Sequence, residues 1–216
     1  WMAEKVSVPV AVHLDHGDSF ERCMEMLKIG FTSIMYDGSA YPVEENARRT
    51  EEVGKVCRAF GVPLEAEIGE LARLDDQGRT MGCSNIADPE VVRQYLTLCR
   101  PDSLAIGIGN AHGFYKGPVD IRVEVLEECR KFTDIPFVLH GCTGMDEGLI
   151  RRAINAGVAK INFGTQIRCQ YVEYLKEGLA EGKDEGHAWK LSRFAEEKLR
   201  GDIRDIIRLA GSEGKA

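Results

Sequence analysis

The sequence contains no long hydrophobic run and no block of like charge. No apolar stretch among its 216 residues approaches the roughly 18 residues of a membrane-spanning helix, and residues 1–5 lack the apolar core of a signal peptide. The formal net charge is −7, and acidic and basic residues are spread along the chain. We therefore expect neither a membrane partner nor a nucleic-acid partner.

The seven cysteines show no C-x-x-C spacing, which argues against a paired-cysteine metal or redox site. Their odd number and even scatter also do not resemble a disulfide framework. We expect reduced thiols in a cytoplasmic protein.

Short apolar runs alternate with longer segments of helical periodicity along the chain. Such runs are typical of parallel strands buried on both faces. The expected strands cover residues 9–14, 33–36, 63–67, 103–107, 136–140 and 160–163. The expected helices cover residues 19–28, 43–60, 89–98, 120–132, 146–156, 166–181 and 188–209. This alternation predicts one α/β domain over residues 1–216, built on a parallel sheet with crossover helices.

Polar residues at the strand ends distinguish between a doubly wound open sheet and a (β/α)₈ barrel. A doubly wound sheet concentrates its ligand residues at one switch point, whereas a barrel brings the carboxyl end of every strand to one mouth. No G-x-G-x-x-G opens a helix after the first strand, which also disfavours the doubly wound fold. We favour the barrel because polar residues lie at or just past the ends of several strands: Asp15, His16, Asp37, Ser39, Glu67, His112, His140 and Asn162.

Three histidines on separate strand ends indicate a metal site. Three imidazoles with an open fourth position are the ligand set of a catalytic zinc ion. The motif "HLDHG" at residues 13–17 contains two histidines, and side chains alternate faces along a strand. We choose His16 as the ligand, with His112 and His140, and leave His13 to packing or to support of the site. Asp15 is then a candidate general acid/base, or a carboxylate that orients an imidazole. The alternative is that all these histidines are ordinary core residues.

Glycine-rich turns follow three of the expected strands: "GIGNAHGFYKG" at residues 107–117, "LHGCTG" at 139–144 and "KINFGT" at 160–165. Glycine allows a close approach of backbone to ligand, and N–H groups at a helix start bind phosphate. Each turn is a weak signal alone, because barrels need tight loops. The last of them lies where late barrel loops commonly hold phosphate.

Five motifs in this order, "HLDHG", "LEAEIG", "NAHGFYKG", "LHGCTG" and "KINFGT", resemble the class II, zinc-dependent fructose-bisphosphate/tagatose-bisphosphate aldolase family. The resemblance extends from the first expected strand to the C-terminus. It implies a TIM-type barrel and reversible cleavage of a phosphorylated ketose to dihydroxyacetone phosphate and an aldehyde. It also implies zinc on His16, His112 and His140, a secondary cation position at Glu67, and Asp15 as the acid/base at the substrate's C4 hydroxyl.

The resemblance further implies a set of substrate-binding residues. Gly113, Gly141 and Thr143 would line a phosphate and monovalent-cation (Na⁺ or K⁺) site, Asn162 would contact the ketone half, and Thr165 its phosphate. The same set includes Lys116 and Gly164. No Schiff-base lysine is required, because a metal stabilises the ene-diolate.

The chain departs from the family pattern after "LEAEIG". The family continues there with two glycines and a proton-transferring glutamate, whereas this chain has "ELARLDDQG" at residues 70–78. Ala72 and Arg73 replace the glycines, and Asp75 takes the place of the glutamate. The loop is expected to be stiffer, with a shorter acid. A catalytically impaired or repurposed relative that binds metal and sugar phosphate is therefore the alternative function.

Two other differences concern subgroup and extent. Cys142 stands where the family prefers glycine, and Gly164 stands where fructose-type members carry aspartate, so we favour the tagatose-type subgroup. The family carries roughly two further strand–helix units before the first motif. About six units are expected in this sequence. We interpret the smaller number as a fragment, a truncated gene model, or a barrel that another chain completes. By analogy the protein is expected to form a homodimer or homotetramer.

Overall fold

Six parallel strands form one sheet that curls into part of a barrel. The computed structural model describes all atoms of residues 3–70, 86–113 and 120–215, and the backbone of 72–74 and 80–81. The sheet order is β1-β2-β3-β6-β8-β9, and every neighbouring pair is parallel. The strands are β1 (His13–Gly17), β2 (Ser33–Tyr36), β3 (Leu64–Ile68), β6 (Ser103–Ile106), β8 (Phe137–Leu139) and β9 (Val158–Ile161).

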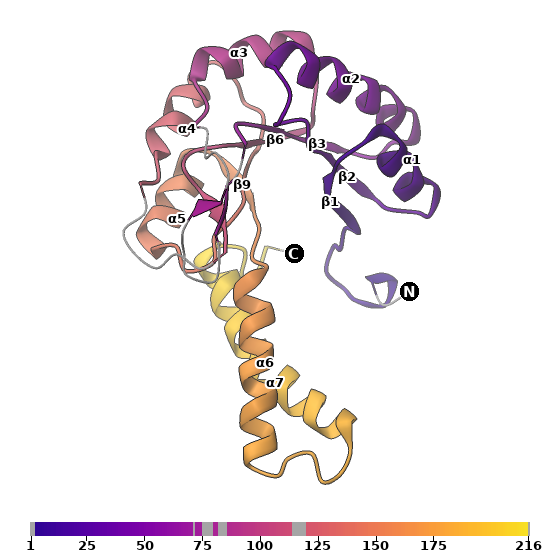
Figure 1. Cartoon of the computed structure of the whole chain (residues 1–216), viewed down its shortest axis with the longest axis vertical. Coiled ribbons are helices and arrows are strands. Elements are labelled where there is room, and N and C mark those ends of the chain that lie inside the picture. The colour runs from indigo at the N-terminus through magenta and orange to yellow at the C-terminus, as the bar shows by residue number, and fades with distance from the viewer. Residues whose placement is uncertain (1–2, 71, 75–79, 82–85, 114–119, 216) are drawn as a thin grey trace.

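A helix follows each of these strands. Figure 1 shows α1 to α5 along the convex side of an arc, with the strands on its concave side. The helices are α1 (Phe20–Lys28), α2 (Val43–Phe60), α3 (Pro89–Leu98), α4 (Val123–Arg130), α5 (Glu147–Asn155), α6 (Thr165–Ala180) and α7 (Ala188–Leu209); a 3-10 turn, η1, covers Ala3–Lys5. The arrangement confirms the predicted partial (β/α)₈-type barrel with six strand–helix units.

Local sequence explains where several helices begin. Ser19, Asp88 and Asp146 cap α1, α3 and α5 by accepting hydrogen bonds from backbone N–H groups in the first turn. Such caps satisfy donors that have no partner within the helix. The helices pack on the sheet through a core that includes the buried side chains of Leu104, Phe137 and other residues of β6 and β8. These three caps thus fix where α1, α3 and α5 begin.

Three expected elements differ from the structure by two or more residues at their ends, each because hydrogen bonding to a neighbour decides the element. The first strand begins at His13 and not at residue 9, because β2 pairs with it only from Ser33 onward. The last strand, expected at 160–163, is β9 (Val158–Ile161), because its pairing with β8 begins at Val158 and shifts register before Lys160. The helix expected at 120–132 is α4 (Val123–Arg130), because the Arg122 N–H donates to the Ile108 carbonyl, 2.8 Å away, and holds residues 120–122 to the preceding loop.

A second sheet, which the sequence did not predict, lies at the edge of the site. Its order is β5-β4-β7, formed by β4 (Ala72–Leu74), β5 (Thr80–Met81) and β7 (Ala111–His112). β4 is antiparallel to β5 and parallel to β7. The segment expected to be a loop at 70–78 therefore enters and leaves through paired strands, and Asp75 lies outside the described residues.

Helices α6 and α7 form a hairpin that projects from the arc (Figure 1). The helices approach closely at Gly178, where an added Cβ would lie 2.7 Å from Leu191 and from Phe194. The Tyr174 hydroxyl donates to Asp202 across the hairpin, at 2.9 Å. The hairpin is thus held by direct contacts between its two helices.

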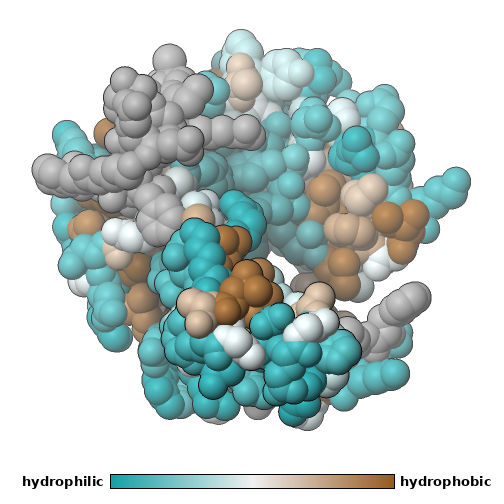
Figure 2. All heavy atoms as spheres, turned by 60° about the horizontal axis from the view of Figure 1, so that its bottom comes forward, coloured by the Kyte–Doolittle hydropathy of each residue, from teal (hydrophilic) through white to brown (hydrophobic). Residues whose placement is uncertain are grey.

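Most of the surface seen from the hairpin end is hydrophilic, with hydrophobic side chains gathered in separate patches (Figure 2). Exposed apolar residues on the hairpin include Val172, Trp189 and Ile207. In the described part of the chain, no helix combines the length and apolar character that a membrane span requires.

Alkylation should distinguish Cys169 from the other described cysteines. Cys169 is exposed, whereas Cys23, Cys57, Cys99, Cys129 and Cys142 are buried. Burial raises the pKa of Cys23 and of Cys142 to about 12, so little thiolate forms at neutral pH. Iodoacetamide treatment of the native protein, followed by peptide mass spectrometry, is expected to modify Cys169 and spare these five. Rapid labelling of Cys23 or Cys142 would contradict this packing.

Candidate active site

Three histidine rings converge at the carboxyl ends of the strands. His16 is the penultimate residue of β1, His112 ends β7, and His140 follows β8 directly. The His16 Nε2 lies 3.2 Å from both the His112 Nε2 and the His140 Nδ1. One nitrogen from each ring lies within 4.8 Å of the others. Three imidazole nitrogens around one point are a donor set that fits a zinc ion with an open position.

The backbone turns sharply at His16. Its φ is 55°, a left-handed conformation uncommon outside glycine, and the β1–β2 register shifts between Leu14 and Gly17. The turn aims the ring at the other two histidines. The Nδ1 of His16 lies 2.7 Å from Asp37 Oδ2, so the carboxylate orients the ring. Sequence analysis placed Asp37 at a strand end but gave it no role.

The hydrogen bond between His16 and Asp37 shifts the pKa of both side chains. Burial raises the pKa of Asp37, but hydrogen bonds from His16 and Ser39 outweigh it and lower the value to about 2. Burial lowers the pKa of His16, whereas the hydrogen bond to Asp37 and the charge of Glu67 raise it above the ordinary value. Asp37 is therefore a carboxylate at neutral pH and stabilises an N–H on His16 Nδ1.

Glu67 lies next to this pair, at the end of β3. It is 1% exposed, and its Oε2 is 3.6 Å from His16 Nδ1. His16, Asp37 and Glu67 form a second group whose donor atoms lie close enough for one ion. The backbone carbonyl of Glu67 accepts a hydrogen bond from the buried Asn46 amide at 2.8 Å. The geometry is compatible with the secondary cation position predicted for Glu67.

Asp15 lies on the open side of the histidines. Its carboxyl oxygen Oδ1 is 3.9 Å from His16 Nε2 and 4.0 Å from His140 Nδ1, and the side chain is 55% exposed. The Asn162 amide, which follows β9, donates to the same oxygen at 3.5 Å. A solvent-accessible carboxylate beside the ring nitrogens can exchange protons with a molecule bound there.

The loop after β8 meets the start of α6. The buried Thr143 hydroxyl accepts a hydrogen bond from the Gln166 N–H at 3.1 Å. Gly164 is the N-cap of α6 and Thr165 its first residue. The Thr165 hydroxyl accepts from Arg168 at 3.3 Å, a cation that sequence analysis did not single out. This end of the site combines hydroxyl groups, a helix N-terminus and a guanidinium.

Close backbone contacts require glycine beside the histidines. Gly113, after His112, has φ 131°, and Gly141, after His140, has φ 67°. A Cβ on Gly141 would lie 2.2 Å from the Ala111 carbonyl oxygen. Lys116 of the predicted substrate-binding set lies outside the described residues.

Below the three histidines, the concave side of the sheet carries further polar groups that sequence analysis did not identify. Glu65 on β3 is 2% exposed and lies 3.0 Å from the His140 Nε2 and 2.7 Å from the Lys160 Nζ. Burial raises the pKa of Glu65, but the hydrogen bond from His140 and the charge of Lys160 outweigh it, and the pKa falls below its ordinary value. Lys160, expected at the start of a strand, is the third residue of β9.

His13 is separated from the three-histidine group. Its Nδ1 lies 2.8 Å from the Ser33 hydroxyl and its Nε2 lies 3.3 Å from the Lys160 Nζ. Burial and the neighbouring Lys160 charge lower the pKa of His13. The structure thus brings His16, and not His13, into the group with His112 and His140.

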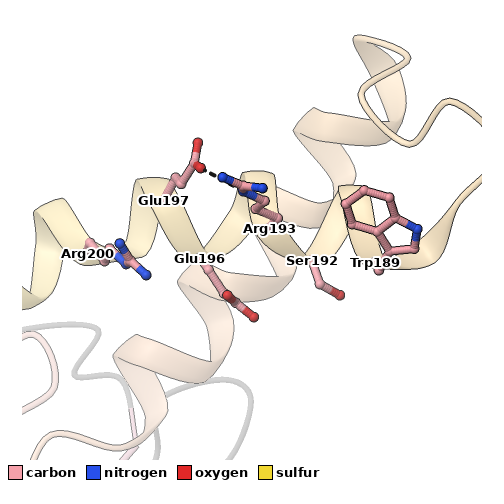
Figure 3. A pocket seen from close by; sticks show the side chains of 6 residues that line it. All are labelled: Trp189, Ser192, Arg193, Glu196, Glu197 and Arg200. Atoms are coloured by element: carbon pink, nitrogen blue, oxygen red, sulfur yellow. Dashed lines mark hydrogen bonds and ion pairs between the residues drawn. The ribbon is translucent and has the colours of Figure 1, made fainter. Parts of the chain in front are cut away.

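A shallow hollow lies on the hairpin, along α7. Its lining side chains come from one face of α7 (Figure 3): Trp189, Ser192, Arg193, Glu196, Glu197 and Arg200. Arg193 and Glu197 pair with each other at 3.2 Å. Both signs of charge alternate along one exposed helix face, and the hollow is remote in sequence from the histidine cluster.

Replacing Gly141 with alanine should damage the fold beside the site. Gly61, at the end of α2, has a similar φ of 68°, but a Cβ there meets nothing within 4 Å. Gly61→Ala is expected to cost about 1–2 kcal/mol from backbone strain alone. Gly141→Ala adds the clash with Ala111 and should lower the free energy of unfolding, measured in urea, by more than Gly61→Ala does. Equal losses would show that the close approach at Gly141 is relaxed in solution.

Comparisons with known proteins agree with this geometry. The family model described as "Fructose-bisphosphate aldolase class-II" matches residues 1–215. A probable fructose-bisphosphate aldolase of Bacillus subtilis is 37% identical over 212 residues, covering 98% of this chain and 74% of that protein. A sulfofructosephosphate aldolase of Alkalicoccus urumqiensis is 34% identical over 212 residues, with the same coverage of both chains.

Solved structures show the same relationship. The crystal structure of the YdjI aldolase of Escherichia coli K12 has a TM-score of 0.82 and 32% identity, over 100% of this chain and 73% of that chain. A putative fructose-1,6-bisphosphate aldolase from Coccidioides immitis has a TM-score of 0.85 and 27% identity, over 99% of this chain and 75% of that chain. The chain belongs to the class II fructose-bisphosphate aldolase family.

Proposed function

We propose that this protein is a zinc-dependent aldolase that reversibly cleaves a phosphorylated ketose to dihydroxyacetone phosphate and an aldehyde. The convergence of three histidine nitrogens from separate strand ends, with Asp15 beside them, carries the proposal. His16, His112 and His140 would hold the zinc ion. The bound ion supplies Lewis-acid stabilisation of the negative charge that develops at the ketone oxygen as the carbon–carbon bond breaks.

The other site residues receive roles in binding and proton transfer. Asp15 accepts the proton of the C4 hydroxyl in the cleavage direction, where Asn162 helps to hold the ketone half. Asp75 moves a proton on the released three-carbon fragment. Phosphate binding is assigned to Gly113, Lys116, Gly141, Thr143, Gly164 and Thr165. Gly113, Gly141 and Thr143 also line a Na⁺ or K⁺ site. The hydroxyls of Thr143 and Thr165 at the start of α6 support the phosphate assignment. Glu67 offers a secondary cation position beside His16.

The substrate class is a phosphorylated ketose, with tagatose-1,6-bisphosphate favoured by Gly164. Relatives carry names that specify fructose bisphosphate, sulfofructosephosphate and, in a Bacillus subtilis protein 34% identical over 215 residues, 6-phospho-5-dehydro-2-deoxy-D-gluconate. These names define the panel of substrates to compare. Free thiols at the six described cysteines support a cytoplasmic location, and the family relationship supports a homodimer or homotetramer.

A metal-binding relative with impaired catalysis is the second candidate function. The observation that favours it is the segment at residues 70–78, which enters through β4 paired with β7, where the family has a mobile glycine-containing loop. Such a protein would bind zinc and sugar phosphate without efficient cleavage.

Zinc content and cleavage, measured on the same preparation, test the function. We expect about one zinc ion per chain by atomic emission. Release of dihydroxyacetone phosphate from the substrate panel should be abolished by a chelator and restored by zinc. His112→Ala is expected to lose both zinc and cleavage. Stoichiometric zinc without cleavage of any panel member would favour the impaired relative, and wild-type protein that takes up no zinc would refute both candidates.

Replacing Asp15 should separate catalysis from metal binding. Asp15→Asn removes the proton acceptor but lies outside the cluster of donor atoms, so we expect turnover to fall about 10²–10⁴-fold with zinc content unchanged. Asp134→Asn is the control, because Asp134 is exposed and precedes β8, at the opposite ends of the strands. Full activity in Asp15→Asn would exclude Asp15 as the acid/base.

A further inference from the structure

His140 has two possible neutral tautomers, and the polar groups on the concave side of the sheet determine which one forms. His140 is completely buried, and its two ring nitrogens face different groups. Its Nδ1 lies 3.2 Å from His16 Nε2, in the converging histidine group, and its Nε2 lies 3.0 Å from Glu65 Oε1. A neutral imidazole has one N–H and one lone pair, so only one of these nitrogens is available to a metal.

The donors and acceptors around Glu65 determine which nitrogen that is. A carboxylate only accepts hydrogen bonds, so a lone pair on His140 Nε2 would face another acceptor at 3.0 Å. An N–H on Nε2 removes this repulsion and leaves the Nδ1 lone pair facing His16. The Asn162 amide lies 3.3 Å from both ring nitrogens and therefore favours neither tautomer.

Lys160 allows Glu65 to remain charged in this buried position. Burying an isolated carboxylate is costly, and a nearby cation offsets that cost. The Lys160 Nζ donates to Glu65 Oε2 at 2.7 Å and to His13 Nε2 at 3.3 Å. His13 then has its N–H on Nδ1, 2.8 Å from the Ser33 hydroxyl. In this arrangement the His13 Nδ1–H, the Lys160 ammonium and the His140 Nε2–H each meet an acceptor.

We propose that Glu65, supported by Lys160, is a positioning residue that fixes His140 in the Nε2–H tautomer and presents its Nδ1 lone pair to the metal. The identity of the metal rests on the proposed function. The tautomer of His140 rests only on the hydrogen-bond partners of its ring. Asp37 acts on the opposite side of the cluster, where it accepts from His16 Nδ1 at 2.7 Å. The lone pairs of His16 Nε2 and His140 Nδ1 then face the same point, where a cation satisfies both.

The first test measures the tautomer in zinc-free wild-type protein. Selective ¹⁵N labelling of the five histidines and long-range ¹H–¹⁵N correlation spectra distinguish Nε2–H from Nδ1–H rings. We expect His140 to be an Nε2–H ring, assigned by comparison with single histidine variants. An Nδ1–H ring at His140 would overturn the inference. An Nε2–H ring in a protein that takes up no zinc would support the tautomer assignment while refuting the proposed function.

The second test measures zinc affinity by competition with a chromophoric chelator. Glu65→Gln is expected to weaken zinc binding about 10–100-fold. Because a single charge change could disturb folding, the double variant Glu65→Gln/Lys160→Met, which removes both charges, is measured beside it and should show a loss of the same order.

Glu173→Gln is the matched control. Glu173 makes only a described surface pair with Lys176, at 2.7 Å on α6, and its loss should leave zinc affinity unchanged. Unchanged affinity in a folded Glu65→Gln/Lys160→Met variant would overturn the positioning role.

Discussion

Parallel strands in a curled sheet all end on the same side, and this constraint creates the site. Residues far apart in the sequence are delivered to one place: His16 and His140, 124 positions apart, are neighbours. Each short helix returns the chain to the start of the next strand, so helix caps such as Ser19 and Asp146 contribute indirectly to the placement of the histidines. The two larger hydrophobic clusters lie between helices and sheet, and the concave side carries polar groups beside the small buried cluster of Met35, Ala105 and Val138.

Those polar groups form two levels. The upper level contains the converging histidines, Asp15 and Glu67. The lower level contains Glu65, Lys160 and His13. The lower level is an interior of charges and hydrogen bonds that is costly unless every group has a partner, and the described distances show that each has one. A well-partnered interior of this kind favours a fixed arrangement of the upper level, which the proposed metal site would require.

The sequence predicted the alternation of elements well, because apolar strands and amphipathic helices have different periods. It also singled out His16, His112 and His140 from their positions after apolar runs, and the structure brings these three rings together. It could not predict that the first strand begins only at His13, since pairing with β2 decides that boundary. It missed β7 and the second sheet, because a two-residue strand has no periodicity. Glu65 and Lys160 were missed for another reason. A charged residue within a strand is normally expected to face solvent, and only the curvature of the sheet brings these two strands close enough to pair the charges.

The contact between Lys160 and His13 joins the two edge strands of the sheet, β9 and β1, across its concave side. These residues are 147 positions apart, so the contact has a very high sequence separation. During synthesis, β1 and its helix leave the ribosome long before β9 exists. Until β9 has been made, His13 and Glu65 lack the Lys160 ammonium as a partner, and contacts of large sequence separation slow folding. The chain must therefore be synthesised as far as Lys160 before the surroundings of His13, Glu65 and His140 are complete.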